Sequence, residues 1–89
     1  RMAMLQAIHR HGSIINASRE TGISYRRMRG AIRDMEKILG RPLVKAYRGG
    51  GEGGGAVLTA DALALIDAFQ RFAAGLQQEA DARFQRSFK

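Results

Sequence analysis

Basic side chains crowd one side of the stretch YRRMRGAIRDMEKIL, residues 25–39. If this stretch is a helix, at about 100° per residue they lie opposite an apolar stripe that begins at Met28. An arginine on a helix can bond O6 and N7 of guanine in the DNA major groove, and its neighbours can hold phosphates. The pattern predicts a DNA-reading face, and the alternative is a solvated basic face that aids solubility. The candidate residues are Arg26, Arg29, Gly30, Arg33 and Lys37, with Tyr25 and Arg27 flanking them.

Three residues on or next to this face, Gly30, Ser24 and Tyr25, could have further roles. Gly30 has no side chain, which would let the helix lie closer to the floor of the groove. Ser24 and Tyr25 carry hydroxyls that could bond phosphates or base edges. For Ser24 a second role stays open, since serine is also a favoured N-cap of a helix.

The stretch RGGGEGGGAVLT, residues 48–59, raises the question of a phosphate-binding loop. It lacks the Gly-Lys-Ser/Thr of a Walker loop, and AVLT, which favours a strand, separates the glycines from the next helix. The sequence argues against a nucleotide site, so a disordered linker or a hairpin tip remains. The flanking strand-like segments favour a tip in which Glu52 would repel phosphate. Its candidate contacts to the DNA backbone are Arg48, Gly49, Gly50, Gly51 and Gly53.

No other residues form a catalytic or metal-binding pattern. His9 and His11, the only histidines, would point about 200° apart on a helix and cannot chelate one metal together. The chain has no cysteine, and its carboxylates are scattered along the expected helix surfaces. We therefore expect neither enzyme activity nor a bound metal.

The basic face needs further elements to position it. Apolar residues at helical spacing predict helices over residues 2–11, 14–21 and 25–39, each followed by a glycine. Only a tight turn at Gly22 separates the second helix from the third, which is typical of a helix-turn-helix. In the third helix we expect a buried stripe of Met28, Ala31, Ile32, Met35 and Leu39.

A hairpin and a long helix should follow. LVKAYR, residues 43–48, and AVLT, residues 56–59, predict two strands, and Thr59 can cap a last helix. The apolar stripe of that helix continues further than a small three-helix core can cover. We therefore expect dimerisation through Ile66, Phe69, Phe72, Ala73 and Leu76.

The 89 residues fit one small domain with a formal net charge of +7 and a pI near 11.1. Residues 1–48 hold 11 Lys/Arg against 3 Asp/Glu, or +8, and residues 49–89 hold 4 against 5, or −1. The positive field therefore belongs to the first half, where an anionic partner would bind. No apolar run is long enough for a membrane span, no signal peptide is visible, and the absence of cysteine fits the cytoplasm.

The segment GSIINASRETGISYRRMRGAIRDMEKILGRPLV resembles the winged helix-turn-helix of LysR-type regulators. With GGGEGGGAVLT it is similar, more closely, to the N-terminal domain of ModE-type molybdate-responsive transcriptional regulators. The resemblance implies a mainly α fold with a small β-hairpin. Residues 1–59 would be a winged helix-turn-helix DNA-binding domain with its wing at 48–55, and residues 60–89 a C-terminal dimerisation helix. The recognition helix would start at Ser24, Tyr25 and Arg26.

In ModE-type regulators a β-rich C-terminal domain senses molybdate. Nothing after Ser87 could form such a domain, so we expect no cofactor in this chain and assign molybdate only to a sensor domain outside it. The resemblance implies a sequence-specific bacterial transcriptional regulator, a cytoplasmic homodimer that binds double-stranded DNA and no membrane. The alternative is a nucleoid-type architectural protein that binds duplexes without sequence preference.

Overall fold

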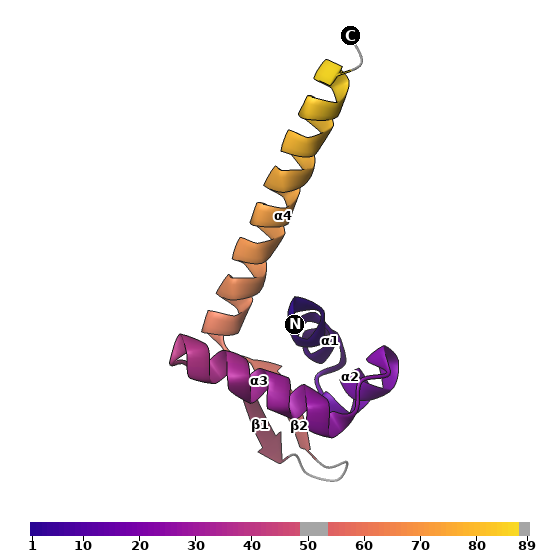
Figure 1. The fold of residues 1–89 in the computed structure, drawn as a ribbon. Coiled ribbons are helices and arrows are strands. Elements are labelled where there is room, and N and C mark those ends of the chain that lie inside the picture. Colours follow the sequence, from indigo (N-terminus) through magenta and orange to yellow (C-terminus); the bar gives the residue numbers. More distant parts are fainter. Residues whose placement is uncertain (49–53, 88–89) are drawn as a thin grey trace.

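The computed structural model describes residues 1–48 and 54–87. Its elements are α1 (Met2–His11), α2 (Ile14–Thr21), α3 (Tyr25–Leu39), β1 (Val44–Arg48), β2 (Gly54–Leu58) and α4 (Ala60–Ser87). The first three helices form a cluster, from which α4 rises on one side and the hairpin projects on the other (Figure 1). The predicted mainly α fold with a small hairpin is confirmed, and the bounds of the first three helices agree with those predicted.

Serines and glycines determine where α2 and α3 begin and where the first three helices end. The hydroxyls of Ser13 and Ser24 each accept a hydrogen bond from the backbone amide three residues later, at 3.1 and 3.2 Å. These are N-caps, which satisfy amides that have no partner within the helix. At the other ends the chain enters the left-handed region at Gly12, Gly22 and Gly40, whose φ angles are +64°, +74° and +68°.

The core lies between the helix cluster and the hairpin. Its largest fully buried side chains are Leu5 and Ile8 of α1, Met28 of α3, and Leu43, which precedes β1. No charged or polar residue is buried in the part of the chain that the structure describes. Burial of apolar area in this cluster is therefore what holds α3 in place.

The apolar stripe of α3 is buried along most of its length. Met28, Ile32 and Met35 are buried, and Ala31 is half-buried, as the spacing predicts. The prediction for Leu39 is wrong, because this side chain is 46% exposed. The helix continues one turn beyond the core, so the periodic position exists there without anything to pack against.

The hairpin is antiparallel and is attached to the turn between α1 and α2. Its register runs from Val44↔Leu58 to Arg48↔Gly54, so β2 starts two residues before AVLT. The amide of Ala56 donates to the carbonyl of Gly12 at 2.8 Å, which ties β2 to that turn.

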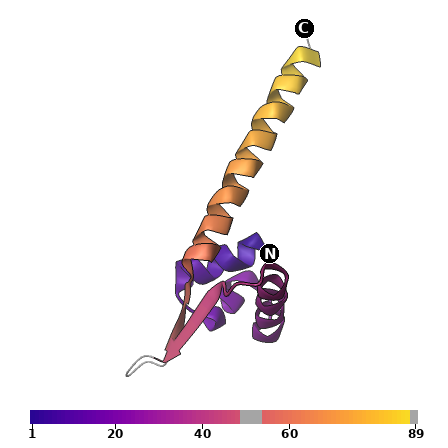
Figure 2. The same cartoon turned by 90° about the vertical axis from the view of Figure 1, so that its left-hand side faces the viewer.

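α4 is a 28-residue helix, and it makes the molecule long, at 62 × 27 × 20 Å. Ala62 and Ile66, in its first two turns, belong to the core, and the rest of the helix leaves the cluster (Figure 2). Among residues 1–48 and 54–87, no helix is long and apolar enough to cross a membrane.

Candidate nucleic-acid interface

The outer face of α3 carries the basic residues that the sequence predicts there. Arg26, Arg27, Arg33 and Lys37 are exposed, on a helix whose opposite side is buried in the core. Since the core fixes α3, these cations project from a rigid support.

The cations of α3 have no carboxylate partner in the described chain, whereas several arginines elsewhere do. Arg10 bonds Glu20, Arg41 bonds Asp61, and the arginines of α4 pair with acidic residues of the same helix. Among residues 1–48 and 54–87, no carboxylate lies within 4.0 Å of a charged nitrogen of Arg26, Arg27, Arg29, Arg33 or Lys37. A row of unneutralised charges on one helix is suited to bind phosphates.

Arg29 has a different orientation from the exposed arginines of α3. It is half-buried, it donates to the hydroxyl of Tyr25 at 3.1 Å, and its guanidinium lies 5.8 Å from the centre of the Tyr25 ring. Both residues line a hollow between α3 and the hairpin. Arg29 therefore lies at the edge of the basic face next to the hairpin, and not at the centre of that face.

Gly30 has no structural reason to be glycine within the described chain. A Cβ added at Gly30 would have no neighbouring heavy atom within 4 Å, and its backbone has an ordinary helical conformation. A glycine within a helix costs about 1 kcal/mol relative to alanine.

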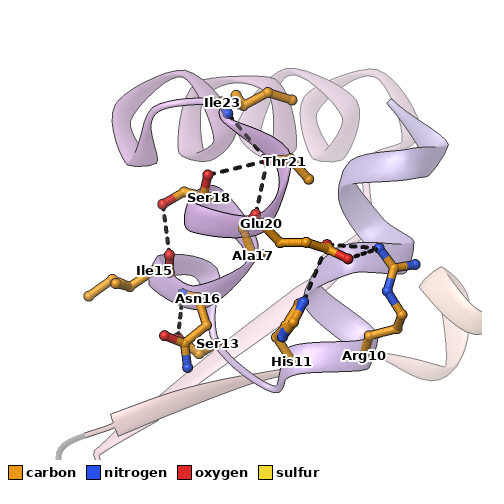
Figure 3. A network of polar contacts seen from close by, with 10 residues as sticks. All are labelled: Arg10, His11, Ser13, Ile15, Asn16, Ala17, Ser18, Glu20, Thr21 and Ile23. Atoms are coloured by element: carbon orange, nitrogen blue, oxygen red, sulfur yellow. Dashed lines mark hydrogen bonds and ion pairs between the residues drawn. The ribbon is translucent and has the colours of Figure 1, made fainter.

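Ser24 acts as the N-cap of α3 through its bond from the amide of Arg27. Its other predicted role, a bond to phosphate or to a base edge, is tested by nothing in the free chain. The turn before it contains a contact that the sequence analysis missed. Thr21 donates to the carbonyl of Ala17 at 2.9 Å and accepts from the amide of Ile23 at 3.3 Å, so it fixes the turn of the helix-turn-helix (Figure 3).

Glu36 is a second residue that the sequence analysis missed. Its carboxylate, half-buried, accepts the backbone amides of Leu43 at 2.7 Å and Val44 at 3.3 Å. It thereby ties the last turn of α3 to the start of β1 and fixes the angle between the basic face and the hairpin. An acidic residue one turn before Gly40, near the negative end of the helix dipole, was the available signal.

Arg48 is exposed at the end of β1, where it pairs with Gly54. The other predicted contacts of the hairpin tip, Gly49, Gly50, Gly51 and Gly53, lie outside the described residues, as does Glu52. Their contact with DNA stays a prediction. Tyr47, exposed beside Arg48, is a further candidate that the sequence analysis did not name.

Arg10, His11 and Glu20 form a polar network that joins α1 to α2 (Figure 3). Arg10 donates to both oxygens of Glu20, at 3.0 and 2.8 Å, and His11 lies 3.3 Å from the same carboxylate. The hydrogen bond from Arg10 holds the pKa of Glu20 below its ordinary value of 4.5. The network therefore supports the helix pair, away from the basic face.

The residues predicted for dimerisation are divided by the structure into two sets. Phe69, Phe72, Ala73 and Leu76 are exposed on the free part of α4, which is the part that follows Ile66. Ile66 is only 9% exposed, because it is packed in the core of its own chain. Ile66 therefore offers a second chain little surface, and the interface as a whole stays a prediction.

This chain is similar in sequence to known regulatory proteins. The family model described as "Bacterial regulatory helix-turn-helix protein, lysR family" matches residues 1–63. The chain is 45% identical over 76 residues to the molybdenum-pterin-binding protein MopB of Rhodobacter capsulatus, covering 85% of this chain and 28% of MopB. It is 38% identical over 80 residues to the DNA-binding transcriptional dual regulator ModE of Escherichia coli K12, covering 90% of this chain and 30% of ModE.

A solved structure is similar in fold. The crystal structure of ArgP from Mycobacterium tuberculosis aligns with a TM-score of 0.65 and 21% sequence identity, over 94% of this chain and 29% of that chain. The predicted winged helix-turn-helix is thus confirmed as the fold. The chain spans less than a third of the length of these similar proteins.

Proposed function

The chain belongs to the lysR family of bacterial regulatory helix-turn-helix proteins, and on that basis we propose that it is a sequence-specific transcriptional regulator that reads double-stranded DNA. The observation that carries the proposal is the row of cations on α3, which have no carboxylate partner in the described chain. The similarity to ModE, named as a DNA-binding transcriptional regulator, supports the same function.

In this proposal α3 enters the major groove, where some of its residues contact bases and others contact phosphates. Arg26, exposed near the start of the helix, reads a base edge, because a guanidinium can bond two acceptors of guanine at once. Arg29 is held against Tyr25 at the side of the helix, where it binds a phosphate. Arg33 and Lys37, further along, neutralise phosphates or reach bases. Gly30 leaves room for the groove floor.

The hairpin is the wing of this domain and contacts the DNA backbone beside α3. Glu36 supports this arrangement, since its bonds to the start of β1 couple the hairpin to α3. Arg48 supplies charge at the end of the paired strands, and the glycines of the tip allow close approach of backbone amides to phosphate.

The free part of α4 forms a homodimer, and its side chains favour an antiparallel one. Phe69, Ala73, Leu76 and Ala80 alternate between large and small along one face. In an antiparallel pair centred between residues 74 and 75, Phe69 meets Ala80 of the partner subunit and Leu76 meets Ala73 of the partner subunit. A parallel pair would place large against large and leave gaps between alanines, which packs less well.

The assignment is that of a DNA-binding protein with no catalytic role, acting in the cytoplasm where bacterial DNA lies. Residues 1–59 would make the DNA contacts, with the wing at 48–55, and residues 60–89 the dimer. The core crosses that boundary, because Ala62 and Ile66 of α4 are buried in it. The arrangement thus couples the dimer directly to the DNA-binding unit.

Selection of bound duplexes from a random library tests the proposal. We expect an inverted repeat whose half-sites are about one helical turn apart, roughly 34–36 Å, because a two-fold dimer presents two copies of α3. A selection without sequence preference would contradict it and favour an architectural DNA-binding protein.

A further inference from the structure

A hollow of about 200 Å³, with both apolar and polar lining, opens beside the basic face, between the starts of α2 and α3 and the hairpin. Its lining includes Ile15, Tyr25 and Tyr47, the polar residues Ser13 and Arg29, and Gly55 on the hairpin side. Three large, mainly apolar side chains thus line one hollow on a surface that the basic residues of α3 otherwise make strongly polar.

The walls of the hollow are exposed to solvent. Ile15, Tyr25 and Tyr47 are 52%, 44% and 52% exposed. The side chain of Ile15 points away from the helix cluster, toward the side of α2 remote from Glu20 (Figure 3). Exposed apolar side chains that converge on one concave spot favour a partner with an apolar group that fits it.

Both aromatic walls are held in place by their neighbours. A Cβ added at Gly55 would lie 2.5 Å from the hydroxyl oxygen of Tyr47, so the ring of Tyr47 lies across the glycine. Tyr25 is held by the hydrogen bond and the ring contact from Arg29. These contacts restrict both rings, which lowers the entropy lost when a partner binds.

The charge around the hollow restricts the chemistry of a partner. Arg29 lies at the hollow, and Arg29 and Arg33 line a second, smaller hollow beside it along α3. The occupant must therefore bring an apolar group next to negative charge. In duplex DNA the group of that kind in the major groove is the C5-methyl of thymine, close to the phosphates of its strand.

Building on the proposed function, we infer that this hollow receives the C5-methyl group of a thymine in each half-site. Ile15 and Tyr47 are the specificity-determining walls that contact the methyl group. Tyr25 accepts a hydrogen bond from Arg29 and keeps its own hydroxyl proton, which it donates to the neighbouring phosphate. The hollow thereby selects thymine over cytosine at one position.

Replacement of thymine by deoxyuridine tests this inference, because uracil lacks only the methyl group. Each thymine of a duplex selected from the random library is replaced in turn, and dissociation constants are measured by fluorescence anisotropy. For the wild-type chain we expect one position per half-site at which uracil weakens binding about fourfold, the effect of one buried methyl group. In Ile15→Ala and in Tyr47→Leu, thymine and uracil should bind alike at that position.

Ile38→Ala is the matched control, because Ile38 is an exposed apolar residue at the far end of α3 and does not line the hollow. This variant should keep the full difference between thymine and uracil. Thermal melts check that each variant is folded. We expect that it is, because Ile15 and Tyr47 are exposed and contribute little to the core.

Two results would overturn the inference alone: no position at which uracil weakens binding, or a thymine–uracil difference that persists in the Ile15 and Tyr47 variants. If those variants lose affinity equally for both bases, the walls pack on deoxyribose. Failure of the library to yield any preferred duplex would instead overturn the proposed function together with this inference.

Discussion

Arg26 and Arg29 are neighbours on α3, yet the structure gives them different surroundings. Arg26 is exposed, while Arg29 is half-buried and bonded to Tyr25. We expect Arg26→Ala to cost about 1–3 kcal/mol of binding free energy and to relax the preference at one base pair. Arg29→Ala should weaken selected and scrambled duplexes equally and reduce the slope of log K against log salt by about 1. Anisotropy titrations at several salt concentrations measure both, and exchanged behaviour of the two variants would refute this division of roles.

At Gly30 stability and binding should respond in opposite directions. The added methyl group of Gly30→Ala meets no atom of the described chain, so unfolding should become less favourable by about 0.5–1 kcal/mol. Binding to the selected duplex should weaken, because the methyl group holds α3 away from the groove. Gly75→Ala, with equally open surroundings on α4, is the control and should gain stability without loss of affinity. If both variants bind like wild type, Gly30 does not face DNA.

Glu20 makes a pH-dependent contribution to stability. Its pKa is lowered in the folded chain, chiefly by the bond from Arg10, so its contribution is present above the unfolded pKa and is lost as the pH falls through the folded pKa. The wild type should therefore be more stable than Glu20→Gln at neutral pH, and the difference should vanish at a pH below 4.5. Urea titrations at both pH values measure it. A difference that persists in acid would show that the ion pair is not its cause.

At the scale of elements, local signals predicted the helices and left the contacts between elements open. The serine N-caps and the glycines after each helix act within a few residues, so the bounds of the first three helices followed from the sequence. β2 starts early because Gly54 and Gly55 pair with β1, and Ala56 is tied to Gly12, which lies 44 residues earlier. The exposure of Leu39 likewise depends on where the core ends. Such facts come from packing between distant segments, which periodicity does not encode.

The register proposed for α4 can be tested by single cysteines, since the chain has none of its own. In the antiparallel pair the two copies of residue 73 lie about 4.5 Å apart along the helix axis, and those of residue 80 about 16 Å apart. Oxidation should therefore link Ala73→Cys into a dimer and leave Ala80→Cys unlinked, because a disulfide needs Cα atoms within about 7 Å. Non-reducing gels report the result. Linkage of both variants would indicate a parallel pair, and linkage of neither would contradict dimerisation through this face.

At the scale of the whole molecule, the hairpin and the free end of α4 lie at opposite ends of an elongated chain, with α3 near the hairpin end (Figure 2). A dimer made by α4 would leave both basic faces uncovered. The concentration of positive charge in residues 1–48 was readable from the sequence, and so was the outer face of α3. The position of Arg29 beside the hairpin, the link through Glu36 and the hollow beside the basic face were not, because each requires the placement of the hairpin against α3.

The most direct test of the central claim is the ratio of dissociation constants for a scrambled duplex and for the selected duplex at physiological salt. Because α3 presents both base-reading and phosphate-binding side chains, we expect the selected duplex to bind about 10³-fold more tightly or better. A ratio near one would show that the basic face binds only the DNA backbone and would contradict sequence-specific recognition.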